Sequence, residues 1–518
     1  MRALRATATA IVVAAVALAG VRWLNPLPSL EGRSVSSALL DTEQTRLGRG
    51  IAPLIAQHPG LAGVHALPNA RESFAARVLL ARGAERSLDV QYYIWRGDLT
   101  GTLLFAELRE AAQRGVRIRL LLDDNNTVGL DAILAALDGE ANIEVRLFNP
   151  FVIRTPRLIG FVTDFFRLNR RMHNKSFTAD SQATIVGGRN VGDEYFDAVS
   201  GDALLFADLD VLAIGPIVRD VSSDFDRYWA SASAYPADRL LPLVARAEVA
   251  QLEARYADNA NDPAAAAYMA AIRDSTVIAS ALAGTLPFDW APARMVSDDP
   301  AKGLGLASRD DLFLQRLLEI VGEPMTELQL VSPYFVPTAE GVETFTRLAR
   351  SGVQVALLVN SLAATDVDAV HSGYTRRRKA LLKAGIKLYE MRRESQIEPV
   401  RRTGVFGSSA SSLHAKTFAV DRQRLFVGSF NFDPRSANLN TEIGFVIESP
   451  RLAGVLADGF ERGIPERAYE VHLDRDGSLF WTETVDGETL RYDVEPETTT
   501  LQRALVFVLS LLPIEPLL

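Results

Sequence analysis

A short polar pattern, H-x-K-x4-D, occurs twice in this chain of 518 residues. The two copies occupy residues 173–180 and 414–421, and each is followed at the same distance by an Asn in a glycine-containing turn, Asn190 and Asn431. The chain has only six histidines, so two of them at the head of matching frameworks indicate an internal duplication. A duplicated chain is constrained to fold as two similar units.

Both copies are preceded by the same order of predicted elements, an alternating strand, a helix, a glycine and a second strand. These elements cover 87–122 before the first motif and 327–359 before the second. A strand–helix–strand unit predicts a sheet that is covered by helices. We therefore predict an α/β fold of two duplicated lobes, each a mixed β-sheet flanked by helices, with one active site between them.

The duplication and the composition predict five parts along the chain. They are a signal peptide or signal anchor at 1–24, an N-terminal lobe with the first motif at 25–220, a helical linker or insertion at 221–299, a C-terminal lobe with the second motif at 300–455, and a C-terminal extension with an apolar tail at 456–518. Within the extension, 469–492 alternates like a hairpin. The tail is expected either to pack on the core as a helix or to lie in a membrane interface.

The first part has the features of an export signal. Arg2 and Arg5 precede an apolar run at 6–21, which is the arrangement of a secretory signal. Residues 17–19 offer an A-x-A cleavage site, but the run is also long enough for an uncleaved anchor. We expect export, and cleavage stays open.

Each motif places an imidazole and an ammonium side by side, because alternate residues of a strand project to the same face. Together the motifs would supply two imidazoles and two lysines, along with the amides of Asn190 and Asn431 and the hydroxyl of Ser429. This set suits a phosphoryl group, whose displacement needs charge stabilisation and a paired acid and base. The motif aspartates, Asp180 and Asp421, lie at an odd offset from the His and are expected to hold the hairpin.

Composition excludes several other kinds of site. The chain has no cysteine, and its remaining histidines show no metal-ligand spacing, so we predict no metal and no cofactor. The net charge of −9 disfavours non-specific binding of nucleic acid. A loop at 123–126, Asp-Asp-Asn-Asn, is expected near the mouth of the pocket.

On its two motifs the chain resembles the phospholipase D superfamily, whose members carry two such motifs at one shared active site. The longer resemblance is to bacterial phospholipases D of the cardiolipin synthase C type, and it is carried by 87–95, 120–126, 170–177, 187–196 and 432–436. The resemblance implies a catalytic set of His173, Lys175, Asp180, His414, Lys416 and Asp421, with Asn190, Asn431 and Ser429 as phosphate-binding residues. It assigns nucleophilic attack to His173 and acid–base work to His414.

A nucleophilic His needs a carboxylate on its second ring nitrogen. The resemblance places Glu442 in this role after the second motif, and Asp208 holds the matching place in the first half. Asp210 is an alternative to Asp208. Which histidine each carboxylate orients stays open.

The resemblance implies a phosphatidyltransferase that makes cardiolipin from two phospholipids through a phosphohistidine. Phosphatidylethanolamine or phosphatidylglycerol would be the donor and phosphatidylglycerol the acceptor. The alternatives are a hydrolytic phospholipase D, a nuclease-like phosphodiesterase and a non-enzymatic lipid-binding protein. The expected partners are membrane phospholipids and the membrane surface, with no nucleic acid and any protein partner unknown. The expected location is the cell membrane, facing the periplasm.

Two groups of residues are candidates for contacts with lipid headgroups. A basic-aromatic stretch before the first motif could sit among anionic headgroups, although it could equally form an ordinary surface loop and core helix. It contains Arg154, Arg157, Phe161, Phe165, Phe166, Arg167, Arg170 and Arg171. The candidates for binding an ethanolammonium group are Asp123, Asp124 and Glu194.

Overall fold

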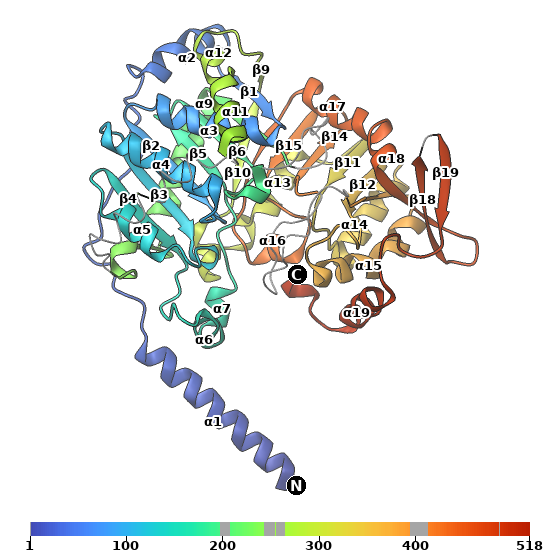
Figure 1. The fold of residues 1–518 in the computed structure, drawn as a ribbon. Coiled ribbons are helices and arrows are strands. Elements are labelled where there is room, and N and C mark those ends of the chain that lie inside the picture. The colour runs from blue at the N-terminus through green and yellow to red at the C-terminus, as the bar shows by residue number, and fades with distance from the viewer. Residues whose placement is uncertain (1, 197–207, 243–253, 255–264, 394–412, 486) are drawn as a thin grey trace.

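The computed structural model describes residues 2–196, 208–242, 254, 265–393, 413–485 and 487–518. Within them, the chain forms two large β-sheets that lie side by side, with helices against each (Figure 1). The first sheet contains β1 (Ala62–Leu67), β2 (Ser87–Tyr92), β3 (Arg117–Asp123), β4 (Ile143–Phe148), β5 (Ser176–Ala179), β6 (Ala183–Gly187), β7 (Asp210–Ile214), β8 (Ala234–Pro236) and β9 (Asp289–Ala291). The second contains β10 (Ala293–Ser297), β11 (Glu327–Val331), β12 (Gln354–Asn360), β13 (Lys387–Met391), β14 (Thr417–Val420), β15 (Arg424–Gly428), β16 (Ile443–Ile447), β17 (Ala468–Leu473), β18 (Leu479–Val485) and β19 (Glu488–Tyr492).

The strand order proves the duplication. In the first sheet the order β4-β3-β2-β5-β6-β7-β1 recurs as β13-β12-β11-β14-β15-β16-β10 in the second. In each copy three strands run parallel and the remaining four are antiparallel to their neighbours. The fold class predicted from the sequence, two mixed sheets flanked by helices, is therefore confirmed.

The helices of the first lobe are α2 (Arg46–Gln57), α3 (Ala70–Gly83), α4 (Leu99–Gln113), α5 (Asp131–Asp138), α6 (Arg157–Thr163), α7 (Phe165–Leu168), α8 (Asp193–Phe196) and α9 (Pro216–Trp229). They are followed by α11 (Ala265–Asp274), α12 (Val277–Leu282), α13 (Phe313–Val321), α14 (Thr338–Arg350), α15 (Asp368–Lys383), α16 (Pro434–Asn438), α17 (Pro450–Glu461), α18 (Ile464–Arg467) and α19 (Thr500–Leu511). Side-chain caps fix where several of them begin. Asp98 accepts from the backbone N–H of Gly101 at the start of α4, as Asn69 does from Glu72 at the start of α3.

The two sheets share a hydrophobic core, which holds the lobes together. Val186 and Val211 of the first sheet are buried in the same cluster as Val427 and Phe445 of the second. These residues lie on β6, β7, β15 and β16, the strands that follow the two motifs. The packing of these strands therefore sets the position of one motif relative to the other.

Between the lobes, the structure differs from the predicted helical linker at 221–299. Part of that segment lies outside the described residues, and the described part holds strands as well as helices. β9 extends the first sheet by pairing with β1, whereas β10 pairs with β16 in the second. Short apolar runs beside alanine-rich sequence concealed these edge strands, since their pairing partners are distant in the chain. The five domain boundaries remain predictions.

The two ends of the chain lie on one side of the molecule. The helix α1 (Arg2–Leu24) projects away from the body, and α19 packs against α15 (Figure 1). None of the helices in the described residues is long and apolar enough to cross a membrane. The predicted hairpin at 469–492 is present as β17, β18 and β19, which extend the edge of the second sheet.

Candidate active site

The two motifs open into one cavity between the lobes. Each His-x-Lys segment immediately precedes an interior strand, β5 or β14. The cavity has a volume of about 390 Å³, and its lining includes His173 and Asn190 from the first lobe and His414 and Asn431 from the second. The prediction that both motifs serve one site is thereby confirmed.

The histidine of each motif is hydrogen-bonded to a carboxylate from the other lobe. Nδ1 of His173 lies 2.8 Å from Oε2 of Glu442, and Nδ1 of His414 lies 2.6 Å from Oδ2 of Asp208. With Nδ1 occupied, Nε2 of each imidazole is the nitrogen left for a substrate. The sequence predicted both carboxylates, and the structure answers the open question of which histidine each one orients.

Backbone contacts between the lobes fix the His173–Glu442 pair. The N–H of His173 donates to the carbonyl of Thr441 at 2.9 Å, and the N–H of Thr441 donates to the carbonyl of Arg171 at 2.9 Å. The N–H of Glu442 in turn donates to Asp298 at 2.9 Å. The short segment that carries Glu442 is therefore bonded directly to the segment that carries His173.

Asp208, the carboxylate that bonds His414, packs directly against the backbone of Gly188 in its own lobe. A Cβ at Gly188 would lie 2.1 Å from Oδ1 of Asp208, so a larger residue would displace that carboxylate. Ser429 occupies the matching place in the second lobe, and its hydroxyl donates to Glu442. Ser429 was predicted to bind phosphate, and the structure corrects this role, because its hydroxyl proton is used to hold the carboxylate.

The alternative carboxylate, Asp210, belongs to a different network. It lies 2.8 Å from Nη2 of Arg77 and 3.4 Å from Nη1 of Arg189, and it accepts from Ser73. Burial alone would raise the pKa of Asp210, but the two guanidinium groups outweigh burial and hold it below its ordinary value. Asp208, and not Asp210, is thus the residue that contacts a histidine.

Each lysine lies beside the histidine of its own motif. Nζ of Lys175 donates to the carbonyl of His173 at 2.6 Å, and Nζ of Lys416 donates to the carbonyl of His414 at 2.6 Å. The expected pairing of imidazole and ammonium is therefore present in both lobes. Two ammonium groups near one another favour the binding of an anion between them.

The site holds its histidines in the neutral form. Burial, followed by the charge of Lys175, lowers the pKa of His173 well below its ordinary value. Burial and Lys416 lower the pKa of His414 to about 4, against the opposing effect of Asp208. Burial also lowers the pKa of both lysines. A bound anion would raise all four pKa values, because it stabilises the charged forms.

The asparagines add hydrogen-bonding groups to the cavity. Oδ1 of Asn190 accepts from the N–H of Ile94 at 3.1 Å, and its buried Nδ2 has no partner in the described residues. Oδ1 of Asn431 is likewise buried and unpartnered among the described residues. Both side chains line the cavity, so Nδ2 of Asn190 is a donor available to a phosphate oxygen.

The motif aspartates lie at the far ends of the hairpins and hold them to the neighbouring strands. Asp180 accepts from the backbone N–H groups of Glu85, Arg86 and Ser87, at distances of 2.8–3.3 Å. Asp421 accepts from Met325, Thr326 and Glu327 in the same way. Neither carboxylate lines the cavity. Their place in the catalytic set is corrected to a structural one, as their odd offset from the His indicated.

Replacing Asp180 with Ala is expected to destabilise the protein without changing the cavity. The substitution leaves three backbone N–H groups without their charged acceptor, which should lower the free energy of unfolding by about 3 kcal/mol. Asp180→Asn keeps one oxygen acceptor and should therefore lower the free energy of unfolding by less than Asp180→Ala does. Urea denaturation followed by circular dichroism measures both. An Asp180→Ala protein as stable as the parent but without turnover would place this carboxylate in the chemistry instead.

The basic stretch before the first motif is mostly committed to internal ion pairs. Arg154 and Arg157 contact Asp124, Arg167 contacts Asp164, and Arg171 contacts Asp123. For these four arginines the structure therefore favours the alternative interpretation of the stretch, an ordinary loop and helix held by internal ion pairs. Arg167 pairs within the stretch, but no sequence pattern indicated that Asp123 and Asp124 fold against the other three arginines.

The same ion pairs remove the predicted ethanolammonium sites. Asp123 and Asp124 are paired with the arginines just described, and Glu194 lies 3.1 Å from Nε of Arg96. None of the three carboxylates is among the residues that line the cavity. Ion pairing with a nearby arginine thus accounts for each of these acids.

Several residues of the cavity were missed by sequence reasoning. Tyr93 and Tyr195 pack edge-on against His173 and His414, with ring centroids 4.8 and 5.4 Å apart. Asp433 also lines the cavity, and burial raises its pKa to about 6. Tyr93 belongs to an alternating strand pattern, which gives no sign that the side chain faces a site. Asp433 caps α16, so its sequence context indicates a cap and nothing more.

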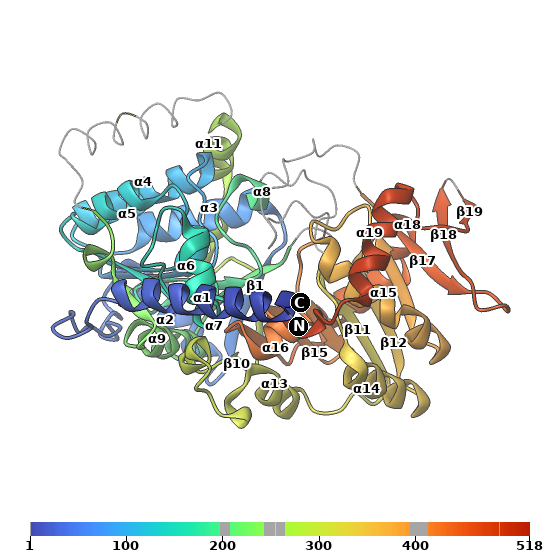
Figure 2. The same ribbon diagram turned by 90° about the horizontal axis from the view of Figure 1, so that it is seen from below.

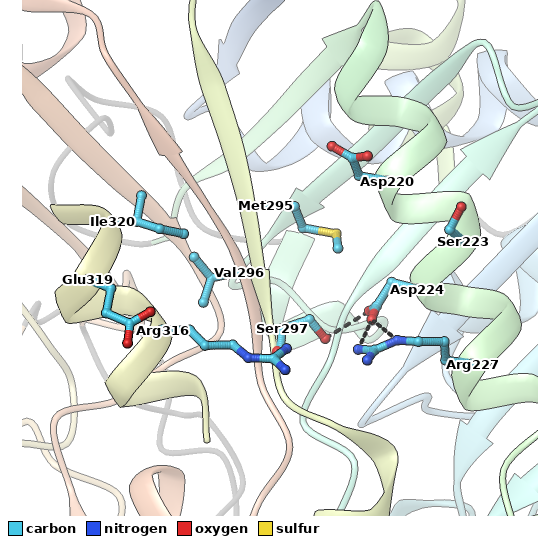
Figure 3. Close-up of a pocket in the computed structure, with 10 residues that line it drawn as sticks. All are labelled: Asp220, Ser223, Asp224, Arg227, Met295, Val296, Ser297, Arg316, Glu319 and Ile320. Carbon is cyan, nitrogen blue, oxygen red and sulfur yellow. Dashed lines mark hydrogen bonds and ion pairs between the residues drawn. The ribbon is translucent and has the colours of Figure 1, made fainter. Parts of the chain in front are cut away.

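A second cavity of about 450 Å³ lies between α9, β10 and α13. Two of its side chains contact Asp224: Arg227 lies 2.6 Å from this carboxylate, and the hydroxyl of Ser297 donates to it at 2.8 Å (Figure 3). Arg316, on the opposite wall, pairs with Asp311 at 2.6 Å. No histidine is among the described residues that line this cavity, so it lacks the imidazoles of the first one.

Comparison with known proteins agrees with this geometry. A family model described as a cardiolipin synthase, PLD-like domain matches residues 80–229 and 317–464. Cardiolipin synthase C of Escherichia coli (strain K12) is 49% identical over 474 residues, covering 91% of this chain and 100% of that protein. Cardiolipin synthase B of the same strain is 24% identical over 395 residues, covering 76% of this chain and 78% of that protein.

A solved structure shares the fold. Phosphatidylserine synthase from Haemophilus influenzae Rd KW20 aligns with a TM-score of 0.51 at 13% identity, covering 89% of this chain and 96% of that chain. The two matched ranges of the family model contain the two motifs and both histidine-orienting carboxylates. The chain therefore belongs to the cardiolipin synthase family with phospholipase D-like domains, as its two motifs indicated.

Proposed function

We propose that this protein is a phosphatidyltransferase that makes cardiolipin from two phospholipids through a phosphohistidine. One observation carries the proposal: two histidines, each bonded to a carboxylate of the opposite lobe, face one cavity, and a lysine is bonded to the backbone carbonyl of each histidine. A nucleophile and an acid–base group at one phosphoryl site are what a two-step transfer requires. The family relationship supports the same substrate class.

In the first step, Nε2 of His173 attacks the phosphorus atom of the donor lipid. The bond between phosphorus and the headgroup oxygen breaks, and a proton from His414 goes to that oxygen, so the headgroup leaves as an alcohol. His414 needs this proton at the outset. The negative charge of the bound diester raises the pKa of His414 from about 4, a value that already includes the effect of Asp208, toward the working range.

In the second step, a hydroxyl of phosphatidylglycerol transfers its proton to His414 and attacks phosphorus. The bond between phosphorus and His173 breaks, which releases cardiolipin and restores both imidazoles. Lys175 and Lys416 stabilise the charge on the phosphoryl oxygens throughout, and the amide of Asn190 adds a donor. With water in place of the acceptor lipid, the same steps hydrolyse the donor.

We also propose that the protein is exported and attached to the cell membrane. Arg2 and Arg5 followed by the apolar residues of α1 support export, and the lipid substrates support attachment to the cell membrane, facing the periplasm. Phospholipids and the membrane surface are then the partners of the protein.

The donor is expected to be phosphatidylethanolamine. Incubation of the purified protein with headgroup-labelled phosphatidylethanolamine and phosphatidylglycerol should release ethanolamine and form cardiolipin in equal amounts, because one headgroup leaves for each diester transferred. Thin-layer chromatography measures both products. Release of glycerol alone, unaffected by phosphatidylethanolamine, would make phosphatidylglycerol the donor. Phosphatidic acid without cardiolipin would mark the protein as a hydrolase.

A further inference from the structure

Two separate helical segments expose large apolar side chains to solvent. On α6 and α7, Leu158 is 71% exposed and Phe166 is 81% exposed. On α19, Phe507 is 64% exposed and Leu511 is 69% exposed. Both segments lie along the same edge of the molecule, and both face the viewer when it is seen from that side (Figures 1 and 2).

Other side chains of these segments line the cavity that contains the two histidines. Phe161 and Leu168 of α6 and α7 form part of one wall, and Leu509 of α19 and Leu512 beyond it form part of the other. The cavity therefore opens between two elements whose outer surfaces are apolar. A lipid that enters this opening can place its acyl chains against these apolar side chains.

Each segment also carries an arginine one turn from its exposed phenylalanine. Arg170 follows Phe166 and donates to its carbonyl at 2.7 Å, and Arg503 precedes Phe507 on α19. Neither guanidinium forms an ion pair with a carboxylate within the described residues. A cation beside an apolar surface suits the boundary between anionic headgroups and acyl chains, where long basic side chains reach outward.

The projecting helix α1 leaves the body at the same edge. Nε of Arg22 lies 3.3 Å from Asp164, the residue between α6 and α7. Trp23 and Leu24, at the end of α1, are 80% and 71% exposed. The base of α1 is thus tied to one of the two apolar segments (Figure 2).

We propose that α6, α7 and α19 form one docking surface that enters the interface of an anionic phospholipid bilayer and places the cavity mouth against the headgroups. The inference rests on the proposed function, because a lipid substrate explains why the apolar segments flank this opening. A protein bound across both segments would close the mouth between them. A bilayer covers the same surface and supplies the substrate laterally.

The absence of cysteine from the chain allows each segment to be probed singly. Phe166→Cys and Phe507→Cys, labelled with an environment-sensitive fluorophore, are to be mixed with vesicles of phosphatidylglycerol and phosphatidylethanolamine. Met325→Cys is the matched control, since Met325 is 75% exposed at the opposite end of β11 from the cavity. The label at 166 and at 507 should shift to the blue and lose emission to nitroxide-bearing lipids, and the label at 325 should not.

A second measurement separates docking from chemistry. In the Phe166→Glu, Phe507→Glu double variant, the ratio of activity on vesicles to activity on short-chain monomeric lipid should fall at least about tenfold, because two apolar side chains no longer enter the interface. Labels that stay water-exposed with vesicles would overturn the inference. So would labels that shift on concentrating the protein alone, which would mean that a second copy covers the surface. If the parent turned over neither lipid form, the proposed function would fail, and the labels would still report docking.

Discussion

Replacement of His173 with Ala is expected to lower the rate of cardiolipin formation by a factor of about 10⁵ or more. Without the imidazole there is no nucleophile, and the lysines and Asn190 can only stabilise charge on a diester that nothing attacks. His414→Ala should lower the rate by a similar factor with natural lipids, because the leaving alcohol and the incoming alcohol both exchange a proton with the imidazole of His414. Initial rates measured with labelled phospholipids give both factors.

The two variants should differ in one respect. With a donor whose leaving group needs no protonation, such as a nitrophenyl ester, His414→Ala should still form a phosphatidyl adduct at His173, detectable by mass spectrometry as an acid-labile modification. His472→Ala is the matched control: His472 bonds Thr482 at 2.8 Å on β17 and β18, outside the cavity lining, and should keep full activity. An adduct on His414 in the His173→Ala protein would reverse the two roles.

Conversion of Glu442 to Gln is expected to reduce kcat by a factor of about 10²–10⁴. An amide is nearly the same size as the carboxylate, but it does not hold the imidazole in the tautomer that leaves Nε2 free, and it does not stabilise an imidazolium. Asp208→Asn should act similarly on His414. Because the pairs cross between lobes, Glu442→Gln should slow adduct formation at His173, whereas Asp208→Asn should slow the proton transfers at His414.

Single-turnover measurements distinguish these effects. Rapid quenching with the nitrophenyl donor reports attack by His173 alone, and Glu442→Gln should slow it while Asp208→Asn leaves it nearly unchanged. Glu461→Gln, an exposed change on α17, serves as the control for loss of a carboxylate outside the site. Slowing of adduct formation by Asp208→Asn alone would contradict the crossed assignment.

Local pattern was enough to predict most of the fold and the charged centre of the site. Strand alternation and the repeated glycine located β2, β3, β11 and β12, and the spacing within the motifs located the histidines and lysines. These features are set by residues that are close together in the chain, so they can be recognised from the sequence. The family resemblance predicts Glu442, and the matching place in the first half then suggests Asp208, with Asp210 as the alternative.

What the sequence left open depends on how distant segments pack. The crossing of the histidine–carboxylate pairs follows from the contact of β6 and β7 with β15 and β16, which no periodicity encodes. Ser429 was misassigned because only the folded turn brings its hydroxyl to Glu442. The clustered arginines near 154–171 suggested an exposed basic surface, although two carboxylates from an earlier segment pair with three of them and Asp164 pairs with Arg167.

The crossed pairs also make each half of the site depend on the folding of both lobes. A chain in which only one lobe has folded has no oriented imidazole, since the carboxylate that each histidine needs resides in the other lobe. Reactivity toward phosphodiesters is therefore withheld until the halves have assembled. Either half made alone should be inert, and mixing separately produced halves should restore turnover only to the extent that they reassociate.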